Sequence, residues 1–91
     1  MRTVWKFQTE TSYIRWSIPV GAKLLSVGSK GNKVTAWFEI DDSAEAQERH
    51  FIIVGTGWPI TGNAKHLGTT QIGAFVWHLY EVSSKTKEAK N

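Results

Sequence analysis

Apolar and polar side chains alternate along most of this chain, and a period of two residues is typical of a β-strand with one buried face. The clearest case runs from 33 to 41, where Val34, Ala36, Phe38 and Ile40 share one face. The same pattern predicts seven strands: Thr3–Gln8, Tyr13–Ile18, Lys23–Val27, Lys33–Asp41, Arg49–Val54, His66–Thr70 and Ala74–Val82. We therefore expect an all-β protein, a small antiparallel sandwich or barrel of six to seven strands.

Turn-forming residues separate the predicted strands. The polar segment 9–12 is typical of a hairpin loop, and the segment 19–21 contains a proline and a glycine that turn the chain. Residues 42–48 are the only good helix-forming stretch, but they have no apolar stripe. We expect a solvated loop there, with at most one short helical turn.

The chain also matches itself at an offset of 42 residues, with seven identities in the 23 positions from Ile18 to Ile40. The identical pairs are Ile18/Ile60, Ala22/Ala64, Lys23/Lys65, Leu25/Leu67, Gly31/Gly73, Val34/Val76 and Glu39/Glu81. This match predicts an internal structural repeat in which each half is a strand, a turn, a short strand, a glycine turn and a long strand. A coincidence of sequence is the alternative.

The composition fits one small globular domain. Its 91 residues are enough for one domain and too few for two, and 41% hydrophobic with 21% charged residues is typical of a folded chain. The absence of cysteine excludes disulfides, thiol nucleophiles and cysteine-based zinc sites. We expect a single β domain over 1–82 and a flexible basic tail over 83–91.

The distribution of charge along the chain indicates which kinds of partner are favoured. Of the net charge of +3, the last nine residues carry +2, because they contain three lysines and one glutamate. Residues 1–82 hold eight Lys or Arg and seven Asp or Glu, a net of +1, which disfavours a nucleic-acid partner. No apolar run approaches the roughly 18 residues of a membrane helix, and no signal peptide is evident. We expect a cytoplasmic protein without membrane contact.

Five tryptophans in a chain of this length are more aromatic surface than a small core needs. If the repeat holds, Val76, Tyr80 and Val82 face inward like their counterparts in the first half. Four side chains would then lie on an outer face: Trp37, Phe75, Trp77 and Leu79. An exposed apolar patch of that kind predicts a homo-oligomer interface or a ligand groove. The alternative is that a sandwich buries both sets of side chains within one chain.

Neither a metal site nor a catalytic motif is indicated. His50, His66 and His78 stand 16 and 12 residues apart, without the short spacing that metal ligands often have. No serine lies in a nucleophile elbow and no lysine in a phosphate-binding loop motif. We therefore expect no enzyme activity, no metal and no cofactor.

The segment Gly55-Thr56-Gly57-Trp58 is the best candidate for a binding site. Glycines on both sides of Thr56 let backbone N–H groups turn toward an anion, and Trp58 offers a ring for stacking. The expected set of ligand-binding residues is completed by a threonine in a nearby turn and two cations: Thr69, Arg15 and Lys65. The structural alternative is a glycine-rich exit from a buried strand.

Four segments of the chain match a known pattern in the same order. They are Trp5-Lys6-Phe7, the segment 19–27 with Gly21-Ala22-Lys23, Gly55-Thr56-Gly57 with Pro59-Ile60, and Phe75-Val76-Trp77-His78. Together they resemble a family of small proteins of unknown function that tailed bacteriophages encode, over nearly all of residues 3–82. In that family a histidine often stands where this chain has Trp58. The resemblance implies an accessory phage protein that acts in the cytoplasm of a bacterial host.

Two hypotheses of function follow. The first is a non-catalytic anti-defence binder, a homo-oligomer that sequesters a nucleotide-type signalling molecule of bacterial immunity. The second is an inhibitor that binds a host defence enzyme through the face carrying Trp37 and Trp77. A third, single-stranded nucleic-acid binding on aromatic side chains, is weakened by the low charge of residues 1–82.

Overall fold

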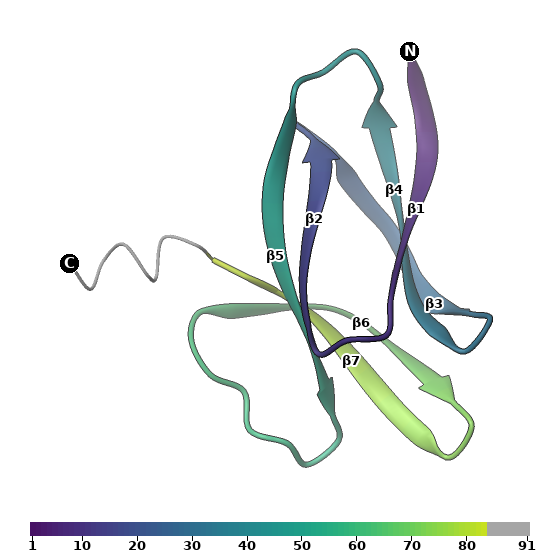
Figure 1. The fold of residues 1–91 in the computed structure, drawn as a ribbon, viewed down its shortest axis with the longest axis vertical. Coiled ribbons are helices and arrows are strands. Elements are labelled where there is room, and N and C mark those ends of the chain that lie inside the picture. Colours follow the sequence, from purple (N-terminus) through teal and green to yellow (C-terminus); the bar gives the residue numbers. More distant parts are fainter. Residues whose placement is uncertain (84–91) are drawn as a thin grey trace.

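Seven antiparallel strands make up the structure, a computed structural model that describes residues 1–83 (Figure 1). Their bounds are β1 (Arg2–Thr9), β2 (Tyr13–Pro19), β3 (Lys23–Lys30), β4 (Lys33–Asp41), β5 (Ala46–Gly55), β6 (Ala64–Ile72) and β7 (Phe75–Val82). All seven predicted strands and the all-β fold are confirmed. No helix of a length and apolarity that would cross a membrane occurs in residues 1–83. Apart from Ser83, the predicted basic tail lies outside the described residues.

The segment predicted as a loop over 42–48 is a loop only in its first half. β5 begins at Ala46, and there Gln47 pairs with Ile18 and Glu48 with Ser17 of β2. These residues form a strand despite their helix propensity, because propensity is a weak local preference that pairing in a sheet can override. No helical turn forms here.

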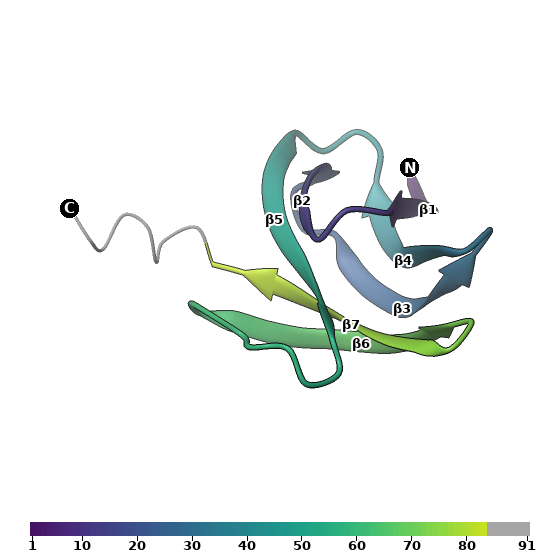
Figure 2. The same cartoon turned by 60° about the horizontal axis from the view of Figure 1, so that its bottom comes forward.

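The strands form two sheets, one with the order β1-β4-β3 and one with the order β2-β5-β7-β6. Figure 2 shows the three-stranded sheet above the β6–β7 hairpin, with β5 and β2 curving along one side. Successive strands β1 and β2 therefore belong to different sheets, and 10–12 is a crossing between layers. The prediction of a hairpin loop at this place is wrong.

The core lies between the two sheets. Its fully buried side chains include Ile18, Phe38, Phe51 and Leu79. Aromatic rings connect the layers: the rings of Phe7 and Phe38 meet edge to face with centroids 5.6 Å apart. Each large apolar side chain buried here contributes about 1.5–3 kcal/mol of transfer free energy.

The 42-residue sequence match corresponds to two similar hairpins, β3–β4 and β6–β7. Both turn at a glycine with a φ of 60°, Gly31 and Gly73. Both carry a register shift at the same place. In β3 it lies between Leu24 and Ser26, and in β6 it lies 42 residues later, between His66 and Gly68. The repeat is therefore structural in its hairpins.

The first strand of each repeated unit is not the one the sequence match suggests. β1 pairs with β4, and β5 pairs with β7 in the equivalent register. Thr3 of β1 faces Ile40, and His50 of β5 faces Val82, the residue that corresponds to Ile40 in the repeat. The repeated units are thus β1-β4-β3 and β5-β7-β6, and β2 is an addition to the second. Ile60, which the match paired with Ile18 of β2, lies outside the strands.

The two units pack through non-equivalent faces, and this corrects the predicted burial of β7. Phe38 of β4 is fully buried, but its counterpart Tyr80 lies on the opposite face of β7 from the fully buried Leu79. The predicted outer face with Trp37, Phe75, Trp77 and Leu79 together is therefore wrong. The cause is that the second unit turns its other face toward the core. A single-chain alternation pattern does not determine that choice.

Candidate ligand-binding groove

The glycine-rich segment after β5 holds Trp58 in one position. The Trp58 N–H donates a hydrogen bond of 3.0 Å to the carbonyl of Gly55, and Gly57 between them has a φ of 94° that favours glycine. The indole lies on the Gly55 backbone, where a Cβ would stand 3.0 Å from Cε2 of Trp58. The absence of a side chain at Gly55 therefore lets the Trp58 ring pack directly on the backbone.

Trp58 is the first member of an aromatic cluster with Trp77 and Phe75. The rings of Trp58 and Trp77 meet edge to face at 5.4 Å and 82°, and those of Trp77 and Phe75 lie 6.0 Å apart. Trp77 packs against the core, whereas Trp58 remains 52% exposed and Phe75 65% exposed. The cluster thus connects the core to the surface.

A groove of about 450 Å³ opens beside this cluster, at one end of the space between the sheets. Its lining residues are Thr9, Glu10, Thr11, Ser12, Asn32, Val34, Ile53, Trp58, Ile72 and Trp77. Val34 and Ile53 are buried core residues that give it an apolar floor. The arrangement of an apolar floor, two indoles and a small set of polar groups is typical of small-molecule sites.

The polar wall of the groove is the crossing between β1 and β2. Thr11 donates its N–H to the Thr9 hydroxyl at 3.1 Å and its own hydroxyl to the carbonyl of Tyr13 at 3.1 Å. The Ser12 carbonyl accepts from the N–H of Ile53 at 3.0 Å, which attaches the wall to β5. Local side-chain hydrogen bonds of this kind hold a turn in one conformation.

The charge of the groove comes from its rim. Glu10 is the single charged residue among its lining residues, and its Oε2 lies 3.3 Å from Nζ of Lys33. Lys33 follows Asn32 at the β3–β4 turn and is paired across it with Lys30. The rim at Glu10 therefore carries one ion pair, with Lys30 as the cross-strand neighbour of its lysine.

Two of the predicted binding residues, Thr56 and Thr69, meet on the outer face of β7 instead. The Thr56 hydroxyl lies 2.9 Å from Nε2 of His78, and the Thr69 hydroxyl lies 3.0 Å from Nδ1 of the same ring. Thr69 also contacts Nε2 of His66 at 3.0 Å. The hydroxyl of Thr56 is thereby engaged in fixing the loop to the sheet.

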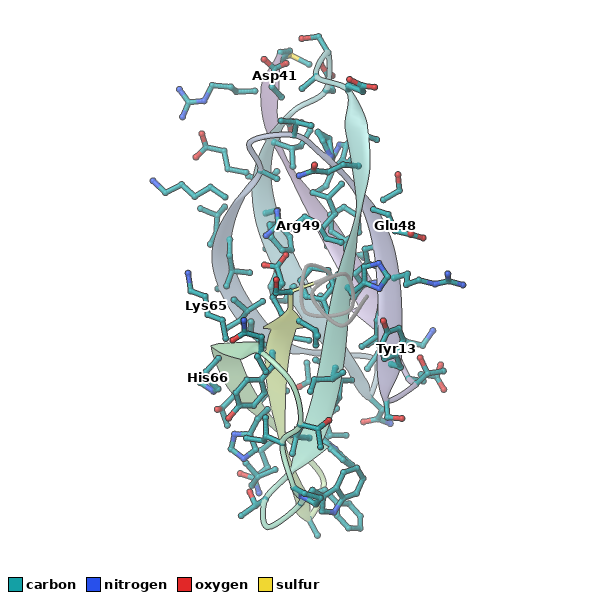
Figure 3. The ribbon with its side chains drawn as sticks, turned by 90° about the vertical axis from the view of Figure 1, so that its left-hand side faces the viewer. Tyr13, Asp41, Glu48, Arg49, Lys65 and His66 are labelled. Carbon is teal, nitrogen blue, oxygen red and sulfur yellow. The ribbon has the colours of Figure 1, made fainter. Side chains whose placement is uncertain are left out.

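The predicted cations lie elsewhere. Arg15 is on β2 beside Glu48, with a separation of 3.9 Å, and Lys65 is paired with Glu81 near the other end of the β6–β7 hairpin from Trp77. Figure 3 shows Lys65 and Tyr13 on opposite sides of Arg49. The structure does not bring Arg15 or Lys65 to the groove at Trp58.

A second cleft, of about 520 Å³, lies near Lys65. It is lined by Gln47, Glu48, Arg49, His50, Asn63, Ala64, Lys65, Glu81, Val82 and Ser83. Its most buried charge is already paired, because Arg49 donates two hydrogen bonds of 2.7 Å to the carboxylate of Glu81. The Arg49 guanidinium also lies over the ring of Phe38, at 5.4 Å. We therefore regard this Arg49–Glu81 pair as part of the packing.

One carboxyl group, that of Asp41, has a displaced pKa. Asp41 is at the end of β4 away from the groove residue Val34, and Figure 3 shows it at the top of the molecule. Hydrogen bonds from the Ser43 hydroxyl at 2.6 Å and the Ser43 N–H at 3.0 Å lower the pKa of Asp41 to about 2. The amino group of Met1, 3.1 Å away, adds to this effect. In turn, Asp42 and Asp41 raise the pKa of that amino group.

For some residues of the groove, nothing in the sequence indicates that they belong to a binding site. Glu10 and Asn32 stand in segments that read as ordinary polar turns, and only the two-sheet arrangement brings them beside Trp58. The side chains of residues 1–83 include no set of three His, Asp or Glu placed to hold a metal ion.

Fold and groove together define a class: a small two-sheet β domain with a structural repeat and an aromatic-lined groove at one end. Residues 1–90 match the family model described as "Domain of unknown function (DUF7352)", and the chain belongs to that family. The prediction of a family of unknown function is confirmed. No curated protein and no solved structure matches the chain.

Proposed function

We propose that this protein is a non-catalytic binding protein that holds a nucleotide-type small molecule in the groove beside Trp58 and Trp77. The observation that carries the proposal is the position of Trp58. Its indole is fixed by Gly55 and Trp77, yet half of its surface faces solvent at the mouth of the groove. An ordered, exposed ring is suited to stacking on a nucleobase.

The surroundings of Trp58 fit the other parts of a nucleotide. Hydroxyl groups of Thr9, Thr11 and Ser12 line the wall and offer hydrogen bonds to a ribose. Lys33 is ion-paired with Glu10, and Lys30, across the turn from Lys33, provides positive charge for phosphates. Lys30 takes the part that the sequence had suggested for Arg15 and Lys65.

We further propose the biological setting that the sequence resemblance implies: a phage accessory protein that removes an immune signalling nucleotide in the cytoplasm of its bacterial host. Sequestration needs affinity and abundance but no catalytic group. In this role the protein acts as a homo-oligomer, because Phe75 and Ile60, 65% and 48% exposed, leave apolar surface uncovered in one chain. Light scattering should give a mass above that of one chain, and a monomer mass would contradict this part of the proposal.

The binding proposal is tested by thermal unfolding and calorimetry of the full chain with cyclic mononucleotides, cyclic dinucleotides and ADP-ribose-type nucleotides. A ligand of the right class raises the melting temperature by the amount expected from RT ln(1 + [L]/Kd). Trp58→Ala should weaken its binding about tenfold or more, since base stacking contributes about 1–3 kcal/mol. Trp5→Ala is the matched control, because Trp5 is also a partly exposed tryptophan, at 42%, but does not line the groove.

A second candidate is inhibition of a host defence enzyme by direct binding. It is favoured by the exposure of Phe75 beyond the edge of the groove, because an exposed aromatic side chain is a frequent anchor at protein interfaces. The predicted inhibitor face with Trp37 and Trp77 is not available as one surface. Trp37 lies on β4 of the three-stranded sheet, where its ring is next to Gly28 of β3, and Trp77 lies on β7 of the other sheet. Stoichiometric capture of one bacterial enzyme by the wild type but not by Phe75→Ser, together with no effect of any nucleotide, would favour inhibition over the nucleotide proposal.

A further inference from the structure

The groove contains a hydrogen-bond acceptor that the proposed function does not yet use. Glu10 lines the groove, and its carboxylate is the only charged group in the lining, among the described residues. An ionised carboxylate accepts hydrogen bonds through two oxygens and donates none. A ligand edge that meets Glu10 must therefore present donors.

Glu10 is held in place by its neighbours. Its Oε2 lies 3.3 Å from Nζ of Lys33. Lys33 is on the neighbouring strand β4, directly before Val34, the residue that pairs with Thr9. Its backbone lies between Thr9 and Thr11, whose side chains hydrogen-bond to each other with 3.2 Å between the two hydroxyl oxygens. The Lys33 ammonium occupies one side of the carboxylate and leaves the other lone pairs available to a ligand.

The Watson–Crick edges of the bases differ in what they offer such a group. Guanine presents two adjacent donors, the N1–H and the N2 amino group, which match the two oxygens of a carboxylate. Adenine presents one amino donor next to an acceptor nitrogen, and so does cytosine. Uracil presents one N–H between two carbonyl acceptors, which a carboxylate repels.

We infer that the groove selects guanine, with the base stacked against Trp58 and its Watson–Crick edge toward Glu10. This inference rests on the proposed nucleotide-binding function and names the base. Lys33 acts as a positioning residue, because its ion pair with Glu10 holds that carboxylate at the rim of the groove. Asn32 also lines the groove, and its side-chain amide offers a donor for the O6 acceptor of the same base.

The test compares nucleotides that differ in the base alone. Isothermal calorimetry of the full chain with GMP and AMP, and with cyclic GMP and cyclic AMP, should give tighter binding of the guanine member of each pair, by about tenfold, the size expected for one bidentate contact. Glu10→Gln should reduce that ratio to about one, because an amide offers only one acceptor and adds a donor that opposes the guanine edge.

Control variants test whether a change in the ratio of guanine to adenine binding is specific to Glu10. Glu45→Gln removes a carboxylate from the exposed turn before β5, outside the groove, and should leave the ratio unchanged. Trp58→Ala should weaken guanine and adenine nucleotides by similar factors, since stacking does not depend on the base edge. Glu10 is largely exposed, with 67% of its side chain accessible, so Glu10→Gln should keep the melting temperature of the free protein.

The outcomes separate this inference from the proposed function. Equal binding of guanine and adenine nucleotides, both lost in Trp58→Ala, would overturn guanine selection and leave nucleotide binding intact. A guanine preference that persists in Glu10→Gln would overturn the role of Glu10. Failure of every nucleotide to bind would overturn the inference together with the proposed function.

Discussion

The backbone of Gly68 in β6 lies directly against the side chain of Val27 in β3. A Cβ placed on Gly68 would stand 2.6 Å from both Cβ and Cγ2 of Val27, well inside van der Waals contact. The two strands belong to different sheets, and each residue lies next to its strand's register shift. This contact is where the two repeated hairpins meet.

Gly68→Ala should therefore destabilise the fold by about 1–3 kcal/mol, because the added methyl group has no room unless one sheet shifts. Urea denaturation monitored by tryptophan fluorescence measures the change. Gly28→Ala is the control, since a Cβ there would meet only the ring edge of Trp37 at 3.3 Å, and its effect should be smaller. Val27→Gly removes both carbons that the added methyl group would meet, so Gly68→Ala should cost less in that background than in the wild type. An equal cost in the two backgrounds would contradict the packing argument.

Leu79 should be the costliest position on β7. It is fully buried in the core cluster, and removing such a side chain leaves a cavity, so Leu79→Ala should cost about 2–5 kcal/mol. Phe75→Ala, on the same strand but 65% exposed, should cost much less. The opposite ranking in equilibrium unfolding would restore the outward orientation of this face that the repeat had suggested.

Alternation along the sequence was sufficient to locate the strands but not to orient them. The segment from Val34 to Ile40 shows its buried face plainly, because its outward residues are more polar. In β7 both faces carry large side chains, with Leu79 and Trp77 on one and Tyr80 and Val76 on the other. Which face is buried depends on how the sheets stack, and this is a long-range property that no local pattern contains.

The candidate site was partly predictable for a related reason. Trp58 stood out because glycines precede it in a break between strands, and it does lie at the groove. Glu10 comes from a turn 48 positions earlier in the chain. Its proximity follows from the crossing of β1 and β2 between sheets, where the sequence suggested a hairpin. Thr56 and Thr69 were expected to share a site, and they do share a partner, but that partner is His78.

The imidazole of His78 should control the mobility of the loop that carries Trp58. Thr69→Val removes the hydroxyl between His78 and His66 and keeps the shape of the side chain, leaving two imidazole nitrogens without that partner. We expect a loss of about 1 kcal/mol and faster amide hydrogen exchange in residues 56–63. Thr61→Val changes an exposed threonine of that loop and should leave exchange unaltered. Unchanged exchange in Thr69→Val would show that the hydrogen bond between Thr69 and His78 is not needed to hold the loop.

Ser43 should influence the free energy of unfolding at low pH, because its hydrogen bonds lower the pKa of Asp41. The lowered pKa of Asp41, about 2 against an ordinary 3.8, means that the folded state favours the carboxylate. Its contribution to stability is therefore fully present above about pH 4 and is lost as the pH falls through about 2. Ser43→Ala removes the hydroxyl donor at 2.6 Å, so the pKa of Asp41 should rise toward 3.8. The carboxyl resonance of Asp41, followed by NMR between pH 1.5 and 6 on the order of every half unit, measures this shift. Ser29→Ala, on β3, should leave that resonance unchanged, and an equal titration of Asp41 in wild type and Ser43→Ala would rule out the hydroxyl as the main cause.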